Sequence, residues 1–81
     1  MKTIWKERLT PDGNVVFPID AQILSVQMQG NKPTVWALVD STDRPTTYRL
    51  KVFGTGHEID REVGRFIGTV QFDGMVFHVF E

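Results

Sequence analysis

Residues 65–80 read RFIGTVQF-DG-MVFHVF, and this stretch decides the fold. Two apolar runs, 65–72 and 75–80, are separated by Asp73-Gly74 alone. Asp-Gly between two such runs is the strongest short-range signal of a β-hairpin, because both central positions of the turn need positive φ. The sequence therefore predicts an antiparallel hairpin with a two-residue turn.

The turn length also predicts the register of this hairpin, which places Phe72 opposite Met75 and Val70 opposite Phe77. Side chains alternate between the two faces of a strand. The predicted core face carries Phe66, Gly68, Val70, Phe72, Met75, Phe77 and Val79. The reverse face carries Ile67, Thr69, Gln71, Val76, His78 and Phe80.

A second hairpin is predicted from the β-rich runs 22–29 and 34–40, which are joined by a loop at residues 30–33. Its apolar face is expected to carry Leu24, Val26, Met28, Val35, Ala37 and Val39. Its other face is expected to carry Ile23, Ser25, Gln27, Trp36 and Leu38. Both reverse faces still hold large apolar groups, whereas the solvent face of an antiparallel sheet is usually more polar.

The rest of the chain adds shorter β elements. Residues 2–7 and 15–17 read as short strands, and 46–53 alternate as one half-buried strand. Residues 58–64 could form a turn or two of helix. We therefore expect a single all-β domain over residues 1–81, with at most one short helix. Five or six strands would form a small antiparallel sheet curled into a barrel or sandwich.

Composition excludes several classes of protein. The 81 residues contain no cysteine, which excludes disulfide scaffolds, thiolate zinc sites and cysteine nucleophiles. The net charge of −1 argues against a partner bound mainly by electrostatics, such as duplex DNA or an anionic membrane. No apolar run approaches the roughly 20 residues that span a bilayer, and the charged start has no signal-peptide core. We expect a cytoplasmic protein without a cofactor.

Several short motifs carry a resemblance to a known family: WALVD (36–40), FGTGH (53–57), GTVQ (68–71) and HVFE (78–81), with KTIWK (2–6) at the start. In these motifs the chain resembles a family of small proteins of unknown function encoded by phages and prophages. The resemblance covers nearly the whole chain and brings no catalytic residue with it. It implies a phage accessory protein that acts in the cytoplasm of a bacterial host.

One loop is a candidate ligand site. Gly54-Thr55-Gly56-His57 follows a predicted strand, and exposed amides in such a loop can cradle an anion. Lys51 and Arg61 are near in sequence, so we name Lys51, Gly54, Thr55, Gly56, His57 and Arg61 as candidate residues for a phosphorylated ligand. The plainer interpretation is a glycine-rich corner, because the loop lacks both the dinucleotide and the P-loop fingerprints.

Other groupings have structural interpretations that we favour. His57 and His78 could form a metal or acid–base pair, but a hydrogen bond from His78 to Thr69 across the hairpin explains His78 adequately. Glu58, Asp60 and Glu62 are expected to be solvated. The basic and tryptophan residues that would suit single-stranded nucleic acid are sparse: Lys32, Arg44, Arg49, Lys51, Trp5 and Trp36. We do not expect nucleic acid as a partner.

The apolar reverse faces predict an interface built from Trp36, Leu38, Ile67, Val76, His78 and Phe80. Self-association, most simply a dimer, would use the face with Trp36 or the face with Phe80; the last strand, if it is a sheet edge, offers a second route. No hydrolase motif is present. We expect a non-enzymatic phage accessory binding protein that inhibits a host protein as a counter-defence. The alternative is an oligomeric sponge for a phosphorylated or nucleotide signal at Gly54–His57.

Overall fold

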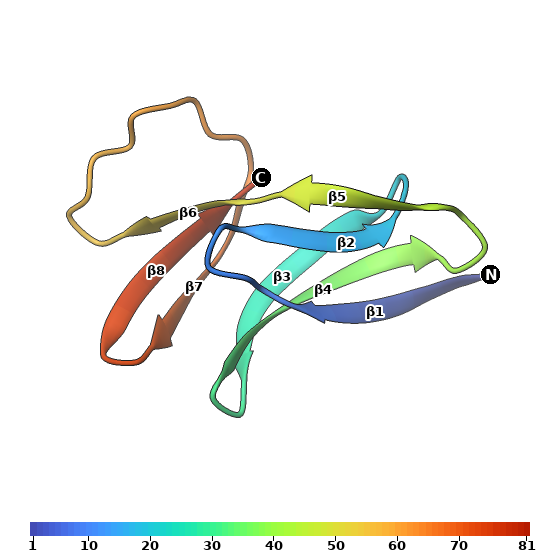
Figure 1. The fold of residues 1–81 in the computed structure, drawn as a ribbon, viewed down its shortest axis with the longest axis horizontal. Coiled ribbons are helices and arrows are strands. Elements are labelled where there is room, and N and C mark those ends of the chain that lie inside the picture. Colours follow the sequence, from blue (N-terminus) through green and yellow to red (C-terminus); the bar gives the residue numbers. More distant parts are fainter.

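The computed structural model describes all residues, 1–81, as eight β-strands with no helix (Figure 1). The strands are β1 (Lys2–Arg8), β2 (Asn14–Pro18), β3 (Gln22–Gln29), β4 (Lys32–Asp40), β5 (Pro45–Arg49), β6 (Lys51–Gly54), β7 (Phe66–Phe72) and β8 (Met75–Phe80). The all-β prediction is confirmed. The expected five or six strands are too few, and one of the additional strands arises because residues 46–53 form two strands that pair in different sheets.

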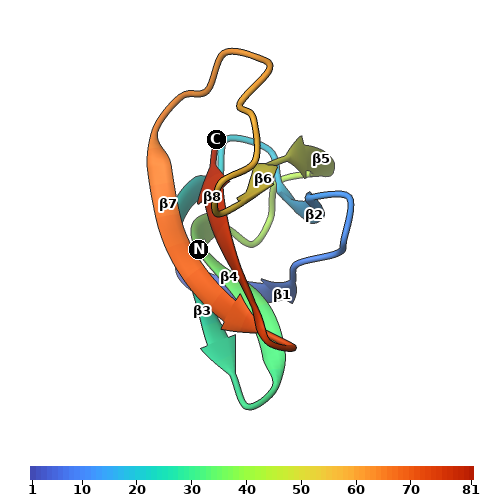
Figure 2. The ribbon, with the colours of Figure 1, turned by 90° about the vertical axis from the view of Figure 1, so that its left-hand side faces the viewer.

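The strands form three small antiparallel sheets: sheet A (β1-β4-β3), sheet B (β2-β5) and sheet C (β6-β8-β7). Strands β3 and β7 pack beside each other and join sheets A and C, whereas β2 of sheet B packs against β1 and β4; the sheets form a flat, sandwich-like arrangement rather than a closed barrel (Figures 1 and 2). Strand β8 is the central strand of sheet C, so the last strand is not a sheet edge and cannot pair with a second copy in that way.

The Asp73-Gly74 hairpin is confirmed in detail. Both turn residues have positive φ, 55° at Asp73 and 77° at Gly74, as the two-residue turn requires. Phe72 lies opposite Met75 and Val70 lies opposite Phe77, which is the predicted register.

Two β-bulges change the predicted faces. In β7 the pairing shifts between Phe66 and Gly68, so Ile67 turns into the core with 8% exposure and Phe66 turns outward with 52%. In β3 it shifts between Ile23 and Ser25, which buries Ile23 and exposes Leu24. The predicted placement of Ile67 and Ile23 on outer faces is therefore wrong. A bulge adds one residue to a strand and thereby exchanges the faces beyond it.

The loop at residues 30–33 is also shorter than predicted. Gln29 pairs with Lys32, which leaves Gly30-Asn31 as a two-residue turn with Gly30 at φ 61°. Val26 still lies opposite Val35, so the centre of this hairpin faces the core as expected.

The predicted single strand at 46–53 is two strands, because the chain changes sheets at Leu50. The Leu50 amide donates a 2.9 Å hydrogen bond to the Gly13 carbonyl instead of to a ladder partner. Gly13 has φ 85°, and a Cβ built on it would lie 2.0 Å from the Leu50 carbonyl oxygen. Only glycine fits this crossing. Leu50 is buried, as the alternation predicted.

The predicted helical turns at 58–64 do not form, and residues 55–65 are an irregular loop. Its C-terminal end is held by other partners: the Gly64 amide donates to the Glu81 carbonyl at 3.0 Å, and the Glu81 amide donates to the Arg65 carbonyl at 2.9 Å. A helix this short is not stable without tertiary support, so these contacts decide the conformation.

All three sheets contribute to one core of twelve buried apolar residues. They are Leu9, Val15, Phe17, Ile23, Val26, Val35, Ala37, Val39, Leu50, Ile67, Val70 and Val79. The faces of sheets A and C that point away from this core are surfaces available for binding.

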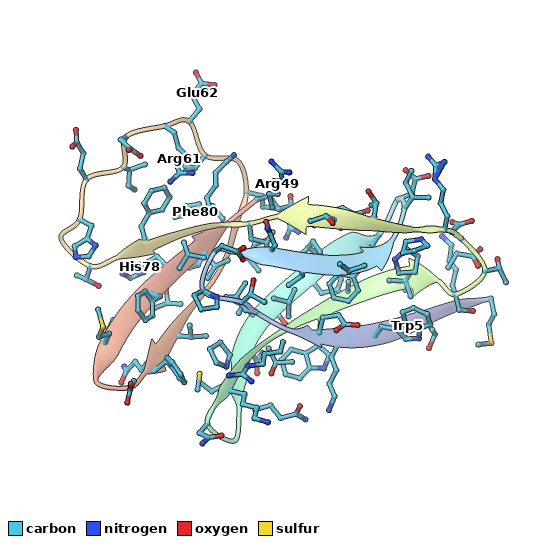
Figure 3. The ribbon with its side chains drawn as sticks, in the orientation of Figure 1. Trp5, Arg49, Arg61, Glu62, His78 and Phe80 are labelled. Atoms are coloured by element: carbon cyan, nitrogen blue, oxygen red, sulfur yellow. The ribbon has the colours of Figure 1, made fainter.

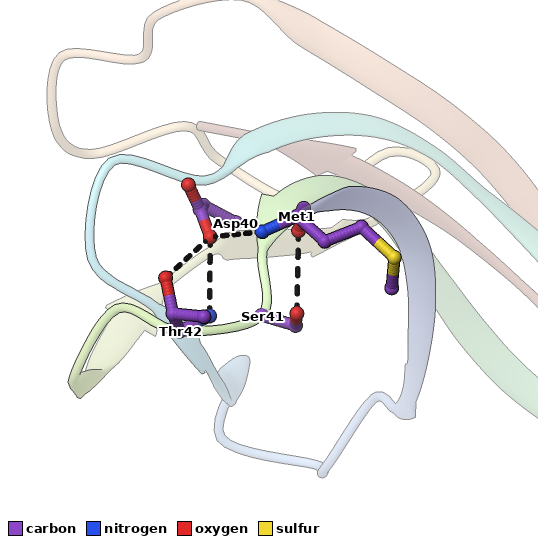
Figure 4. Close-up of polar contacts among 4 residues, drawn as sticks. All are labelled: Met1, Asp40, Ser41 and Thr42. Atoms are coloured by element: carbon purple, nitrogen blue, oxygen red, sulfur yellow. Dashed lines mark hydrogen bonds and ion pairs between the residues drawn. The ribbon is translucent and has the colours of Figure 1, made fainter.

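Asp40 closes the end of sheet A where β1 meets β4 (Figure 4). Its Oδ1 accepts hydrogen bonds from the Thr42 hydroxyl at 2.7 Å, the Thr42 amide at 3.1 Å and the Met1 amino group at 3.0 Å. The bonds from Thr42, followed by the one from Met1, lower the pKa of Asp40 to about 2. The carboxylate is therefore charged at neutral pH and fastens the start of β1.

The crossing of Gly13 and Leu50 generates the first prediction. Gly13→Ala should lower the free energy of unfolding by more than about 3 kcal/mol, because the methyl group collides with backbone that cannot move aside. Gly30→Ala is the matched control: Gly30 also has positive φ, but a Cβ there would meet nothing within 4 Å. It should cost only the backbone strain, about 1 kcal/mol. Urea unfolding measures both. Equal losses would show that the crossing does not constrain the fold.

Candidate functional site

The candidate site lies on the outer face of sheet C, where the ladder aligns the side chains that form it. Thr69 lies opposite His78, and His78 lies opposite Phe53 on the other side. Two residues further along β8, Phe80 lies between Phe66 of β7 and Lys51 of β6. Figure 3 shows His78 and Phe80 at the same end of the molecule as Arg61 and Glu62 of the 55–65 loop, with Trp5 at the opposite end.

His78 is held between two threonine hydroxyls. Its Nδ1 is 2.9 Å from Thr69 Oγ1, and its Nε2 is 2.7 Å from Thr55 Oγ1. A neutral imidazole donates from one nitrogen and accepts at the other, and a hydroxyl can do either, so both contacts can be made at once. The predicted bond across the hairpin to Thr69 is confirmed. The bond to Thr55 was not predicted, and it fastens the start of the 55–65 loop to the sheet.

Four apolar side chains gather beside His78, and we call Phe53, Ile59, Phe66 and Phe80 the aromatic patch. Phe80 makes edge-to-face contacts with Phe66 at 5.4 Å and with Phe53 at 6.2 Å between ring centroids. Phe66 is 52% exposed and Ile59 is 50% exposed, whereas Phe53 is buried beneath them. Edge-to-face packing fixes the rings relative to one another, so the patch is a preformed surface.

The 55–65 loop is fixed over this face by contacts along its length. The Arg61 guanidinium lies 5.5 Å from the Phe53 ring centroid. The His57 ring lies against Gly54, where an added Cβ would come within 2.9 Å of it. At the far end, Arg65 pairs with the Glu81 carboxylate at 3.2 Å and donates to the Ile23 carbonyl of β3. The loop therefore joins sheet C to the edge of sheet A.

A shallow cavity of about 250 Å³ lies between the loop and the sheet. It is lined by the aromatic patch, by residues 54–57 and by Thr69 and His78. The structure thus brings together Gly54, Thr55, Gly56 and His57, predicted as ligand residues, with His78 and Phe80, predicted as interface residues. Phe66 and Ile59, the two most exposed members of the aromatic patch, were not predicted as site residues. Only the bulge at Ile67 puts Phe66 on this face.

The geometry does not resemble an anion cradle. The Thr55 amide donates to the Val76 carbonyl at 3.3 Å, and the His57 amide donates to the Gly54 carbonyl at 3.1 Å. Neither Lys51 nor Arg61 lines the cavity. The Lys51 Nζ donates to the Glu81 carbonyl at 3.2 Å, while Arg61 lies over Phe53 and 3.4 Å from Asp60. Two of the loop amides and both candidate cations therefore already have partners within the chain.

The remaining predicted interface residues are divided between surfaces. Trp36 and Leu38 are half-buried on the outer face of sheet A, opposite Lys6 and Ile4 of β1. Val76 is half-buried on the outer face of sheet C, and Ile67 lies in the core.

The other groupings considered from the sequence stay apart. No cluster of three or more His, Cys, Asp or Glu side chains could hold a metal ion. Glu58, Asp60 and Glu62 are exposed on the 55–65 loop. The basic residues lie on different sheets, with Lys32 in sheet A, Arg49 in sheet B and Lys51 in sheet C. No helix is long and apolar enough to cross a membrane.

Fold and site together define a small all-β protein that presents a fixed aromatic surface beside a hydroxyl-bound histidine. The chain belongs to the family described as Domain of unknown function (DUF7352), whose family model matches residues 1–81. No curated protein and no solved structure gives a significant match to the chain.

The two hydroxyls on His78 generate the second prediction. Thr69→Val keeps the side-chain shape but removes one partner of the imidazole, so it should lower the free energy of unfolding by about 1 kcal/mol. Thr47→Val is the control, because Thr47 is an exposed strand residue whose hydroxyl makes no hydrogen bond. It should change stability by less than about 0.5 kcal/mol. Urea unfolding distinguishes them, and equal effects would mean that the Thr69 bond contributes nothing.

Proposed function

We propose that this protein is a non-enzymatic binding protein that attaches to a protein of a bacterial host through the aromatic patch. The observation that carries the proposal is the exposure of Phe66 and Ile59 on a surface that hydrogen bonds and ring contacts hold in place. Aromatic side chains are enriched at protein interfaces, and a preformed surface loses little conformational entropy on binding.

The proposal includes a phage accessory role in the host cytoplasm, in which binding blocks a host defence protein. This part rests on the sequence resemblance to small proteins of phages and prophages.

The surroundings of His78 support binding rather than catalysis. A general base needs a nitrogen free to reach a substrate proton, whereas both nitrogens of His78 have hydroxyl partners within the chain. No carboxylate orients the imidazole, as it would in a catalytic triad. The nucleotide-sponge alternative is less well supported, since the Thr55 and His57 amides and the Lys51 and Arg61 side chains are engaged elsewhere.

The third prediction is the loss of a captured partner. Tagged wild-type protein should retain a host protein from a lysate of the bacterium that carries the gene. Phe66→Asp should weaken that complex at least about 30-fold, the loss expected for a central aromatic of an interface. Val16→Asp on β2 is the control, because Val16 is also 52% exposed but lies in sheet B.

Binding constants for the captured protein, measured with all three purified baits, decide the outcome. Retention by the Val16 variant and loss by the Phe66 variant support the proposal. Equal retention by all three baits, or no retained protein at micromolar bait, contradicts it.

We also propose that the protein forms a dimer through the outer face of sheet A. This face carries Ile4 at 57% and Leu24 at 37% exposure beside half-buried Trp36 and Leu38. The aromatic patch lies on sheet C, so a dimer built on the outer face of sheet A leaves it available for a partner. Two-fold symmetry would bring the same apolar residues of both copies together.

The fourth prediction follows from this dimer. Light scattering at tens of micromolar should give twice the mass of the chain for the wild type, and Trp36→Glu should give a monomer because it places a charge in the interface. Phe66→Asp, on sheet C, should remain dimeric. A monomeric wild type would rule out the dimer.

A further inference from the structure

A second cavity opens on the inner side of sheet C, away from the aromatic patch. It has a volume of about 250 Å³ and lies between the inner face of β6, β7 and β8 and residues 8–11, which comprise the end of β1 and the start of its connection to β2. We call it the slot. Val52, Val70, Phe72 and Phe77 form the wall on the sheet side. These residues belong to the core side of the sheet: Val70 is buried in the core, whereas Val52, Phe72 and Phe77 are only half-buried at its margin.

The opposite wall is held rigidly. The Leu9 amide donates to the Pro33 carbonyl at 2.9 Å, and the Gly13 amide donates to the Thr10 carbonyl at 2.9 Å. Two prolines, Pro11 and Pro33, contribute fixed rings to this wall. The slot is therefore set by the fold and does not depend on a flexible segment.

Only two of the nine lining residues are polar. Thr10 is occupied, since its hydroxyl donates to the Asn14 carbonyl at 2.8 Å and also contacts the Asp12 carboxylate. Arg8 is the one charged residue, is exposed, and forms no ion pair within the chain. An apolar cavity with a single unpaired guanidinium is complementary to a molecule with an apolar body and one anionic end.

We propose that the slot binds a small amphipathic monocarboxylate, with its acyl chain or ring between Val70, Phe77 and Leu9 and its carboxylate on Arg8. The volume is below the roughly 300–1,000 Å³ of sites for drug-sized molecules, which selects a short chain or a single ring. A phosphate or a nucleotide does not suit the slot, because beyond one guanidinium it offers no donor for a polyanion.

The test is a titration of ¹⁵N-labelled wild-type protein with butanoate, hexanoate and octanoate, followed by NMR chemical shifts. The largest shifts should fall on Leu9, Val52, Val70, Phe72 and Phe77. Each added pair of methylene groups should raise affinity by up to about tenfold until the slot is full. 1-Hexanol should bind about fivefold more weakly than hexanoate, since it lacks the charge that Arg8 would meet.

Variants distinguish the contribution of the Arg8 charge to binding from that of the apolar slot. Arg8→Gln should weaken hexanoate about fivefold and leave 1-hexanol unchanged. Lys2→Gln removes the same charge from the far end of β1 and should change neither. Val52→Phe fills the slot and should abolish binding of both probes. If this variant does not fold, the chemical-shift changes of the wild-type protein still show whether the probes bind in the slot.

The proposal is overturned if no shifts appear at the slot, if they fall instead on Ile59 and Phe66 of the aromatic patch, or if hexanol and hexanoate bind equally well. It is also overturned if Arg8→Gln and Lys2→Gln weaken hexanoate alike, because the effect would then be one of net charge rather than of this guanidinium.

Discussion

The crossing of Gly13 with Leu50 is the constraint on which the rest of the structure depends. The Leu50 amide bonds to the Gly13 carbonyl, and the two backbones approach so closely that no side chain fits between them. At this point the chain leaves sheet B and enters sheet C, and Leu50 itself is buried in the common core. The crossing therefore sets where β6 runs, and β6 carries Phe53 to one face and Val52 to the other. The candidate site and the slot both follow from it.

Much of the fold could be predicted because its signals are local. Asp73-Gly74 specifies a turn by the positive φ of its own residues, and the register of β7 with β8 follows by counting. The two bulges could not be predicted in this way. Whether Ile67 or Phe66 faces inward depends on what packs against it, and here the partner is β3, which comes close enough that a Cβ on Gly68 would lie 2.9 Å from the Val26 carbonyl oxygen. An alternation pattern contains no information about such a tertiary contact.

For the same reason, only part of the candidate site could be predicted from the sequence. The bond between Thr69 and His78 lies within one hairpin, so register alone predicts it. The contacts of His78 with Thr55, of Arg61 with Phe53 and of Lys51 with Glu81 join segments whose spacing along the chain gives no indication of contact. Those contacts change the interpretation of the Gly54–His57 loop, because they engage Lys51 and Arg61, the two cations that looked available to an anion, and leave an aromatic surface exposed beside them.

That surface is the centre of the functional account, and photo-crosslinking inside bacterial cells tests it most directly. A photoreactive phenylalanine analogue placed at position 66 should form a covalent adduct with one host protein, whereas the same analogue at position 16, which is equally exposed on sheet B, should not. The adduct would be seen as a discrete species of higher mass and identified by mass spectrometry. Adducts of the same protein from both positions, or an adduct from position 16 alone, would contradict the assignment of the aromatic patch as the binding surface.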